Sequence, residues 1–148
     1  MNIDFSPPKA VLPFLKDKVD DFYLAGGTAL SMFYFEHRES FDLDFFTRNF
    51  SKERILKIVD NLEKDSQWKV ELVSEQRKEN LVGVAIYMIH LDQEKKCKLD
   101  FVEDYIESLN PLKRVNGLNV LSLEDIYLRK IYAITGHVPT LSDIGRKF

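Results

Sequence analysis

The sequence has few of the residues that build cross-links and zinc clusters. Among 148 residues it contains one cysteine, Cys97, and three histidines, His37, His90 and His137. A single cysteine excludes an internal disulfide and a cysteine-based zinc cluster, and the histidines lack the spacing of zinc ligands. The composition therefore fits a reducing compartment, with Cys97 as a small half-buried residue.

The sequence also lacks an excess of charge of one sign and a long apolar run. Lysine and arginine number 21 against 24 acidic residues, so the formal net charge is -3. Such a chain has no general attraction to nucleic acid, and any site for a polyanion must be local. The start, MNIDFSPPKA, has acidic and proline residues where a secretory signal needs a basic start and an apolar run. We expect a cytoplasmic protein without a membrane span.

The length and the pattern of apolar residues predict one α+β domain over residues 1–148. A chain of this size can bury roughly two-thirds of its unfolded surface without a structural metal. Successive strands with short polar connections favour antiparallel hairpins next to flanking helices, which gives a mixed central sheet. The expected helices are 8–18, 28–37, 51–65 and 122–136, and the expected strands are 21–26, 40–47, 68–75, 81–91, 96–103 and a short strand after the Asn116–Gly117 turn.

A Gly-Gly pair and an Asp-Leu-Asp strand stand on either side of the second expected helix. Gly26 and Gly27 allow a tight turn that brings bare backbone N–H groups to a ligand, and the dipole of the following helix favours phosphate there. Asp42 and Asp44 are two apart on a strand, so both side chains project from one face. Two converging carboxylates repel each other unless a cation lies between them, and Mg²⁺ (or Mn²⁺) that also binds substrate phosphates suits them.

A third carboxylate, Asp100, lies in the apolar strand KCKLDFVE between Leu99 and Phe101. An aspartate in the middle of an apolar strand is hard to explain as a solvated side chain, although an edge strand would permit it. Nucleotidyl transfer needs this set of groups: a turn that holds nucleoside triphosphate (NTP) phosphates, metal-binding carboxylates, and an acid that orients or deprotonates the attacking hydroxyl. We expect Asp42, Asp44 and Asp100 to be catalytic and to bind the metal.

The stretch LAGGTALSMFYFEHRESFDLDFF resembles the signature of the AbiEii/AbiGii-type toxin nucleotidyltransferases, a branch of the DNA polymerase β-like nucleotidyltransferase superfamily. Thr28, Arg38 and Ser40 match the "GGT…R.S.DLDFF" form of this branch, and KLDFV matches the strand of the third acid. The resemblance implies the polymerase β-like fold, nucleotide binding by Gly26, Gly27, Thr28, Arg38 and Ser40, and a catalytic lysine at Lys130 in VLSLEDIYLRKIYAITG. Where the family continues with an Arg/Asp-rich helix, this sequence reads HVPTLSDIGRKF. Either that helix is missing or residues 142–148 are its truncated beginning, so we expect a domain that is short at its C-terminus relative to the family.

The resemblance also implies a toxin–antitoxin or phage-defence context, an antitoxin partner and an RNA acceptor such as tRNA. A protein hydroxyl and a small molecule stay open as acceptors. Short basic clusters at 77–78, 95–98, 113–114 and 146–147 follow an RNA backbone only if they converge on one face; otherwise they are solvated loop ends. Lys130 also fits a solvated helix charge, and Arg38 also fits a pair with Glu36 or Asp42. A non-catalytic nucleotide-binding module that keeps the fold is the alternative to an enzyme.

Overall fold

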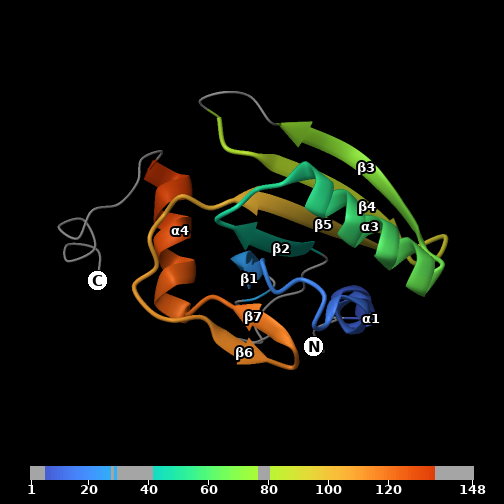
Figure 1. The fold of residues 1–148 in the computed structure, drawn as a ribbon, viewed down its shortest axis with the longest axis horizontal. Coiled ribbons are helices and arrows are strands. Elements are labelled where there is room, and N and C mark those ends of the chain that lie inside the picture. The colour runs from blue at the N-terminus through green and yellow to red at the C-terminus, as the bar shows by residue number, and fades with distance from the viewer. Residues whose placement is uncertain (1–5, 28, 30–41, 77–80, 136–148) are drawn as a thin grey trace.

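A mixed seven-stranded sheet forms the centre of the described part of the protein (Figure 1). The computed structural model describes residues 6–27, 29, 42–76 and 81–135. The strand order is β3-β4-β5-β2-β1-β7-β6. The strands are β1 (Tyr23–Ala25), β2 (Asp42–Thr47), β3 (Lys69–Gln76), β4 (Val84–His90), β5 (Lys96–Glu103), β6 (Lys113–Val115) and β7 (Leu118–Val120).

The described residues contain three helices, two of which begin after a capping serine. They are α1 (Ser6–Leu15), α3 (Lys52–Ser66) and α4 (Leu123–Thr135). The hydroxyl of Ser51 accepts a hydrogen bond from the N–H of Arg54, and that of Ser122 accepts one from Asp125 N–H, so both serines cap their helices. Except for Ala29, the helix expected over 28–37 lies outside the described residues, and so does the expected stop at Gly136.

The pairing of the strands places the expected catalytic strands side by side. The hairpins β3-β4 and β4-β5 are antiparallel, as predicted from their short polar connections. Strand β2 pairs parallel with β5 and antiparallel with β1, while β1 pairs parallel with β7. The β1 and β2 segments are thus direct neighbours, which places the Gly-Gly turn beside the Asp-Leu-Asp strand.

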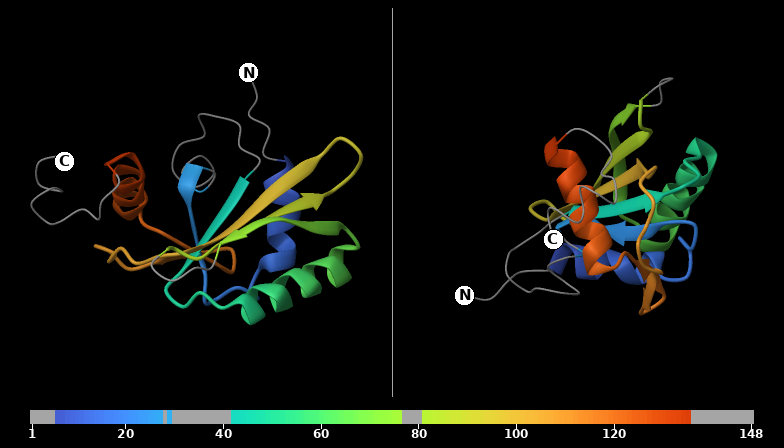
Figure 2. Two further views of the ribbon diagram at one scale, coloured as in Figure 1. Left: turned by 90° about the horizontal axis from the view of Figure 1, so that it is seen from above. Right: turned by 90° about the vertical axis from the view of Figure 1, so that its left-hand side faces the viewer.

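One face of the sheet packs against α1 and α3, and the other face carries the polar side chains. Leu43, Phe45, Leu99 and Phe101 are buried in a core that includes the apolar stripe of α3. Because side chains alternate along a strand, Asp42, Asp44 and Asp100 project from the opposite face. Figure 2 shows α1 and α3 together on one side of the sheet, with α4 apart from them beside β1.

The region after β5 differs from the sequence prediction by one strand. Only a short strand after the Asn116–Gly117 turn was expected, whereas β6 and β7 form a hairpin around it. Both turn residues have positive φ, 49° and 76°, as a two-residue hairpin turn requires. Strand β6 is exposed and contains Lys113 and Arg114, so it lacks the apolar alternation that marks a strand in a sequence.

Candidate active site

Asp44 and Asp100 are partners in the register of two adjacent parallel strands. In the pairing of β2 with β5, Asp42 is opposite Lys98 and Asp44 is opposite Asp100. All four side chains project from the face of the sheet that is not covered by α1 and α3. The structure therefore brings the third expected acid next to the expected metal-binding pair.

Gly26 lies next to these carboxylates, on the side of β1. Ala25, the last residue of β1, is opposite Asp44, and Gly26 follows with a φ of 75° that favours glycine. A Cβ atom at Gly26 would lie 2.3 Å from Oδ2 of Asp44, so only glycine leaves room for that carboxylate. Gly27 follows directly and is partly exposed. The backbone thus turns at Gly26 directly against Asp44, one of the two aspartates expected to bind the metal.

The electrostatics of the carboxylates are those of a buried cluster of like charge. Burial and the charge of Asp100, with a smaller effect of Asp42, raise the pKa of Asp44 to about 7. Burial also raises the pKa of Asp100, which Lys98 opposes. Oδ1 of Asp100 is buried without a hydrogen-bond partner in the described part of the chain. Two facing carboxylates of this kind repel each other when both are ionised, and a cation between them would remove this repulsion.

Lys98 supplies part of the positive charge that the cluster needs. Its ammonium nitrogen lies 3.2 Å from Oδ2 of Asp100. Lys98 is two residues before Asp100 on β5, so both side chains share one face. Together with Asp42, Lys98 lines a pocket of about 350 Å³ that opens next to the carboxylates.

The carboxylates fit a divalent cation that shares its coordination with a substrate. Within residues 6–27, 29, 42–76 and 81–135, no group of three or more His, Cys, Asp and Glu side chains is arranged to hold a metal alone. Mg²⁺, however, usually takes one or two carboxylates and completes its shell with water and substrate phosphates. The facing Asp44 and Asp100, with the unpartnered Oδ1 of Asp100, provide donors of that kind.

Other expected site residues lie elsewhere or outside the description. Lys130 is half-buried on α4, and no hydrogen bond or ion pair in the described residues joins it to Asp42, Asp44 or Asp100. Thr28, Arg38 and Ser40, expected to bind the nucleotide, lie outside the described residues. The structure thus brings together Gly26, Asp42, Asp44 and Asp100.

A buried charge cluster beneath α4 was not predicted from the sequence. Arg129 donates to Oδ2 of Asp104 at 2.7 Å and to the carbonyl of Ile106 at 2.7 Å, and it lies 3.6 Å from Asp125. Tyr23 of β1 donates to the same oxygen of Asp104. Burial and this carboxylate raise the pKa of the Tyr23 phenol. The only sequence signal is the i, i+4 spacing of Asp125 and Arg129, which an exposed helix face shows equally often.

The described helices include none long and apolar enough to cross a membrane. Cys97 is fully buried, and burial with the nearby carboxylates raises the pKa of its thiol to about 12, which leaves it unreactive at neutral pH.

The sheet order, the glycine turn and the facing aspartates define a nucleotidyltransferase fold, and known structures agree. A proposed nucleotidyltransferase from Helicobacter pylori superposes with a TM-score of 0.60 at 16% identity, over 96% of this chain and 66% of that one. The protein JHP933 from Helicobacter pylori superposes with a TM-score of 0.56 at 17% identity, over 88% of this chain and 58% of that one. The chain therefore spans under two-thirds of the length of these structures.

Residues 14–144 match the family model described as nucleotidyl transferase AbiEii toxin, type IV toxin–antitoxin system. This match covers most of the sequence, so the chain belongs to that family. No curated protein matches the chain. The resemblance inferred from the sequence motif is thereby confirmed, together with the fold that it implied.

Proposed function

We propose that the protein is a metal-dependent nucleotidyltransferase that moves a nucleoside monophosphate from an NTP to a hydroxyl group of RNA, such as tRNA. The observation that carries this proposal is the register of Asp44 and Asp100 beside Gly26. Family membership supports nucleotidyl transfer. The identity of the metal, of the acceptor and of the nucleotide goes beyond what family membership gives, and we propose these three points here.

In this account Asp42, Asp44 and Asp100 would hold Mg²⁺ or Mn²⁺ together with the substrate phosphates. The turn at Gly26 and Gly27 would bind the triphosphate, assisted by Thr28, Arg38 and Ser40. The cation would neutralise the charge that develops on the phosphates during transfer. Asp100, which is opposite Asp44, would also orient the attacking hydroxyl and accept its proton. The hydroxyl oxygen forms a bond to the α-phosphorus, the bond from that phosphorus to the α,β-bridging oxygen breaks, and pyrophosphate leaves.

The alternative is a non-catalytic module that binds a nucleotide. A module that only binds phosphate needs the glycine turn but has no use for a third carboxylate next to the Asp pair. The position of Asp100 opposite Asp44 therefore favours the enzyme.

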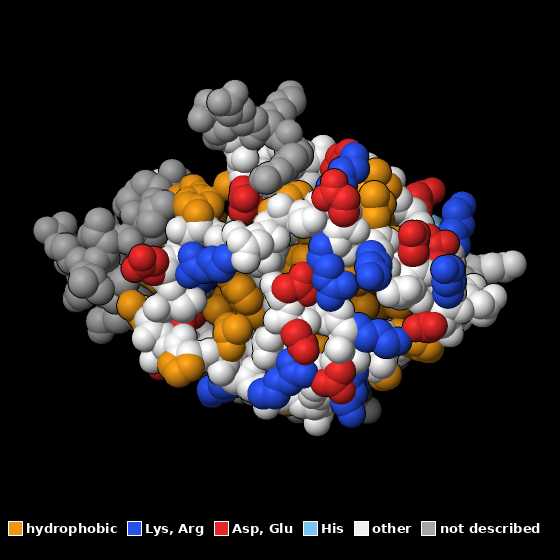
Figure 3. All heavy atoms as spheres, viewed as in Figure 1, with side chains coloured by type: hydrophobic (Ala, Val, Ile, Leu, Met, Phe, Trp, Pro, Cys, Tyr) orange, Lys and Arg blue, Asp and Glu red, His pale blue; other side chains and the backbone are white. Residues whose placement is uncertain are grey.

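The family description supports a further proposal, that the protein is the toxin of a toxin–antitoxin pair in the cytoplasm, with an antitoxin protein as its partner. Charge of both signs is spread over the face on the α3 side, as Figure 3 shows, so that face is not a continuous basic surface for RNA. An RNA site is better sought on the opposite face, where the carboxylates lie.

The binding half of the proposal is tested by titration calorimetry with each of the four NTPs. Binding that requires Mg²⁺ and is lost in Asp44→Asn, but kept in the control Asp60→Asn on the exposed face of α3, supports the carboxylate site. NTP binding of equal strength without a divalent cation, or in Asp44→Asn, would contradict it.

A further inference from the structure

We propose that the pocket next to the carboxylates is the binding site of the acceptor strand, where lysines hold a phosphate of single-stranded RNA while its hydroxyl reaches Asp100. This inference rests on the proposed nucleotidyl transfer and adds the place and the chemistry of the second substrate. Among the basic clusters in the described residues, it selects the one formed by Lys95, Lys96 and Lys98.

The pocket continues the carboxylate cluster on the side opposite to the glycine turn. In the sheet order β4-β5-β2-β1, Gly26 follows β1 on one side of Asp44, whereas the pocket extends over β5 and β4 on the other. The row across these strands consists of Asp42, Lys98 and Met88 in register. A donor at the turn and an acceptor in the pocket would thus approach the carboxylates from opposite sides, as in-line displacement requires.

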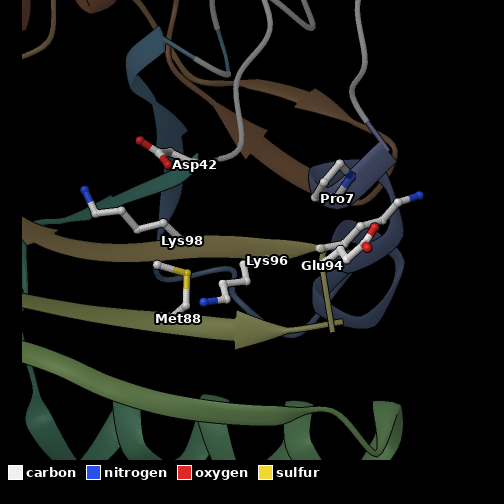
Figure 4. A pocket seen from close by; sticks show the side chains of 7 residues that line it. Pro7, Asp42, Met88, Glu94, Lys96 and Lys98 are labelled. Carbon is white, nitrogen blue, oxygen red and sulfur yellow. The ribbon is translucent and has the colours of Figure 1, made fainter. Parts of the chain in front are cut away.

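The lining of the pocket combines positive charge with an apolar surface. Figure 4 shows Asp42, Lys98 and Met88 at one end, Pro7 and Glu94 at the other, and Lys96 between them. Lys98 is paired with Asp100, so Lys95 and Lys96 are the lining lysines that can offer their charge to a phosphate. Met88 gives a base or a ribose an apolar surface. At about 350 Å³ the pocket has room for a small ligand, so it suits one nucleotide of a single strand.

Lys95 lies in the turn between β4 and β5, which the side chain of Asp92 orders, and Lys96 is the first residue of β5. Oδ1 of Asp92 accepts hydrogen bonds from the N–H groups of Glu94 and Lys95 at 2.8 and 2.7 Å, and these bonds lower the pKa of Asp92. The N–H of Leu91 donates to the carbonyl of Lys95, which closes the β4-β5 connection. In the described part of the chain Lys96 forms no ion pair, so its ammonium group is available to a phosphate.

The test measures binding of a labelled single-stranded RNA oligonucleotide and, separately, of an NTP to the full chain at several salt concentrations. The test variant is Lys95→Ala/Lys96→Ala, and the control is Lys57→Ala, an exposed lysine of α3 on the other side of the sheet. Each neutralised phosphate of a single strand contributes about 0.7 to the slope of log K against log salt concentration. The double variant should therefore bind RNA roughly tenfold more weakly, with this slope reduced by about 0.7. NTP affinity should change by less than about twofold, since the triphosphate lies at the glycine turn.

RNA affinity and salt slope equal to those of the wild type would overturn the proposal, and so would the absence of RNA binding by the wild type. A parallel loss of NTP binding would assign the pocket to the donor instead. A DNA oligonucleotide of the same sequence that binds as well as RNA would overturn the choice of RNA. These binding results do not depend on turnover, so a wild type that binds RNA through the lysines but transfers no nucleotide would refute the catalytic function and leave the acceptor site standing.

Discussion

The missing Cβ of Gly26 and the carboxylate of Asp44 share the same space. An ideal Cβ at Gly26 would lie 2.3 Å from Oδ2 and 2.9 Å from Cγ of Asp44. Glycine is therefore required at position 26 for two reasons: the backbone has a positive φ there, and a side chain would displace Asp44. This relationship couples the predicted phosphate turn to the predicted metal site.

Gly26→Ala should abolish nucleotidyl transfer and destabilise the fold by on the order of 1–3 kcal/mol, because the new methyl group displaces Asp44 and strains the backbone. Unfolding by urea and the transfer rate of the folded fraction measure the two effects. Gly117→Ala is the matched control: its φ is +76°, and its Cβ would meet Lys16, away from the carboxylates. That control should lose stability and keep its activity, and a Gly26→Ala variant of normal activity would contradict the coupling.

The charge of Asp44 should make the metal-free protein less stable as the pH rises. Its pKa is 3.8 in the unfolded chain and about 7 in the folded protein, so between these values the folded state binds the additional proton. The protonated Asp44 therefore contributes stability that is fully present below pH 3.8 and is lost progressively as the pH rises to about 7. In the presence of a chelator, Asp44→Asn should become progressively more stable than the wild type over this range, by on the order of 1–3 kcal/mol above pH 7.

Urea unfolding of both proteins at a series of pH values tests this prediction, because the difference between them cancels the titrating groups that do not interact with Asp44. Asp60→Asn, on the exposed face of α3, should show no such trend. A stability difference for Asp44→Asn that does not change with pH would show that Asp44 ionises normally.

Arg129→Met should be severely destabilising. Arg129 is 7% exposed and neutralises Asp104 and Asp125, which are 4% and 0% exposed. Removing the guanidinium leaves these buried carboxylates without a cationic partner, which costs about 3–5 kcal/mol. Thermal and urea unfolding measure this loss. Arg114→Met removes exposed ion pairs with Asp17 and Asp20 and should change stability little; equal effects of the two variants would contradict the structural role of the buried cluster.

Lys130→Ala tests the family-derived lysine. If Lys130 contacts the transferring phosphate, its removal should lower kcat by at least about tenfold while the unfolding midpoint stays close to that of the wild type. Lys57→Ala serves as the control for the loss of a lysine from a helix. Unchanged kcat in Lys130→Ala would leave Lys98 as the lysine that serves the carboxylates, since its ammonium group lies 3.2 Å from Asp100.

The parts of the fold and site that could be predicted depend on local pattern. Each predictable feature follows from residues within a few positions of one another. Ser51 caps α3, and the apolar stripe of that helix faces the core. The spacing of Asp42 and Asp44 places both side chains on one face of β2. The Gly-Gly turn was predictable for the same reason. These features required no knowledge of the sheet order.

The features that could not be predicted depend on pairings across long sequence separations. The ion pair of Arg129 with Asp104 and the pairing of β2 with β5 join segments far apart in the sequence. Composition and periodicity indicate that Asp100 is unusual, but only the register shows that it faces Asp44. From the sequence, Lys98 could only be assigned to a basic cluster. Its position beside the carboxylates depends on the same register of β2 and β5.

The central claim is tested most directly by following transfer of label from α-labelled NTPs to RNA with Mg²⁺ or Mn²⁺, in the wild type and in Asp44→Asn, Asp100→Asn and the control Asp60→Asn. The account predicts label in RNA only with a divalent cation, kept in Asp60→Asn and lost in the two site variants. Label that persists in Asp44→Asn and Asp100→Asn, or the absence of transfer from all four nucleotides by a wild type that binds them, would contradict it.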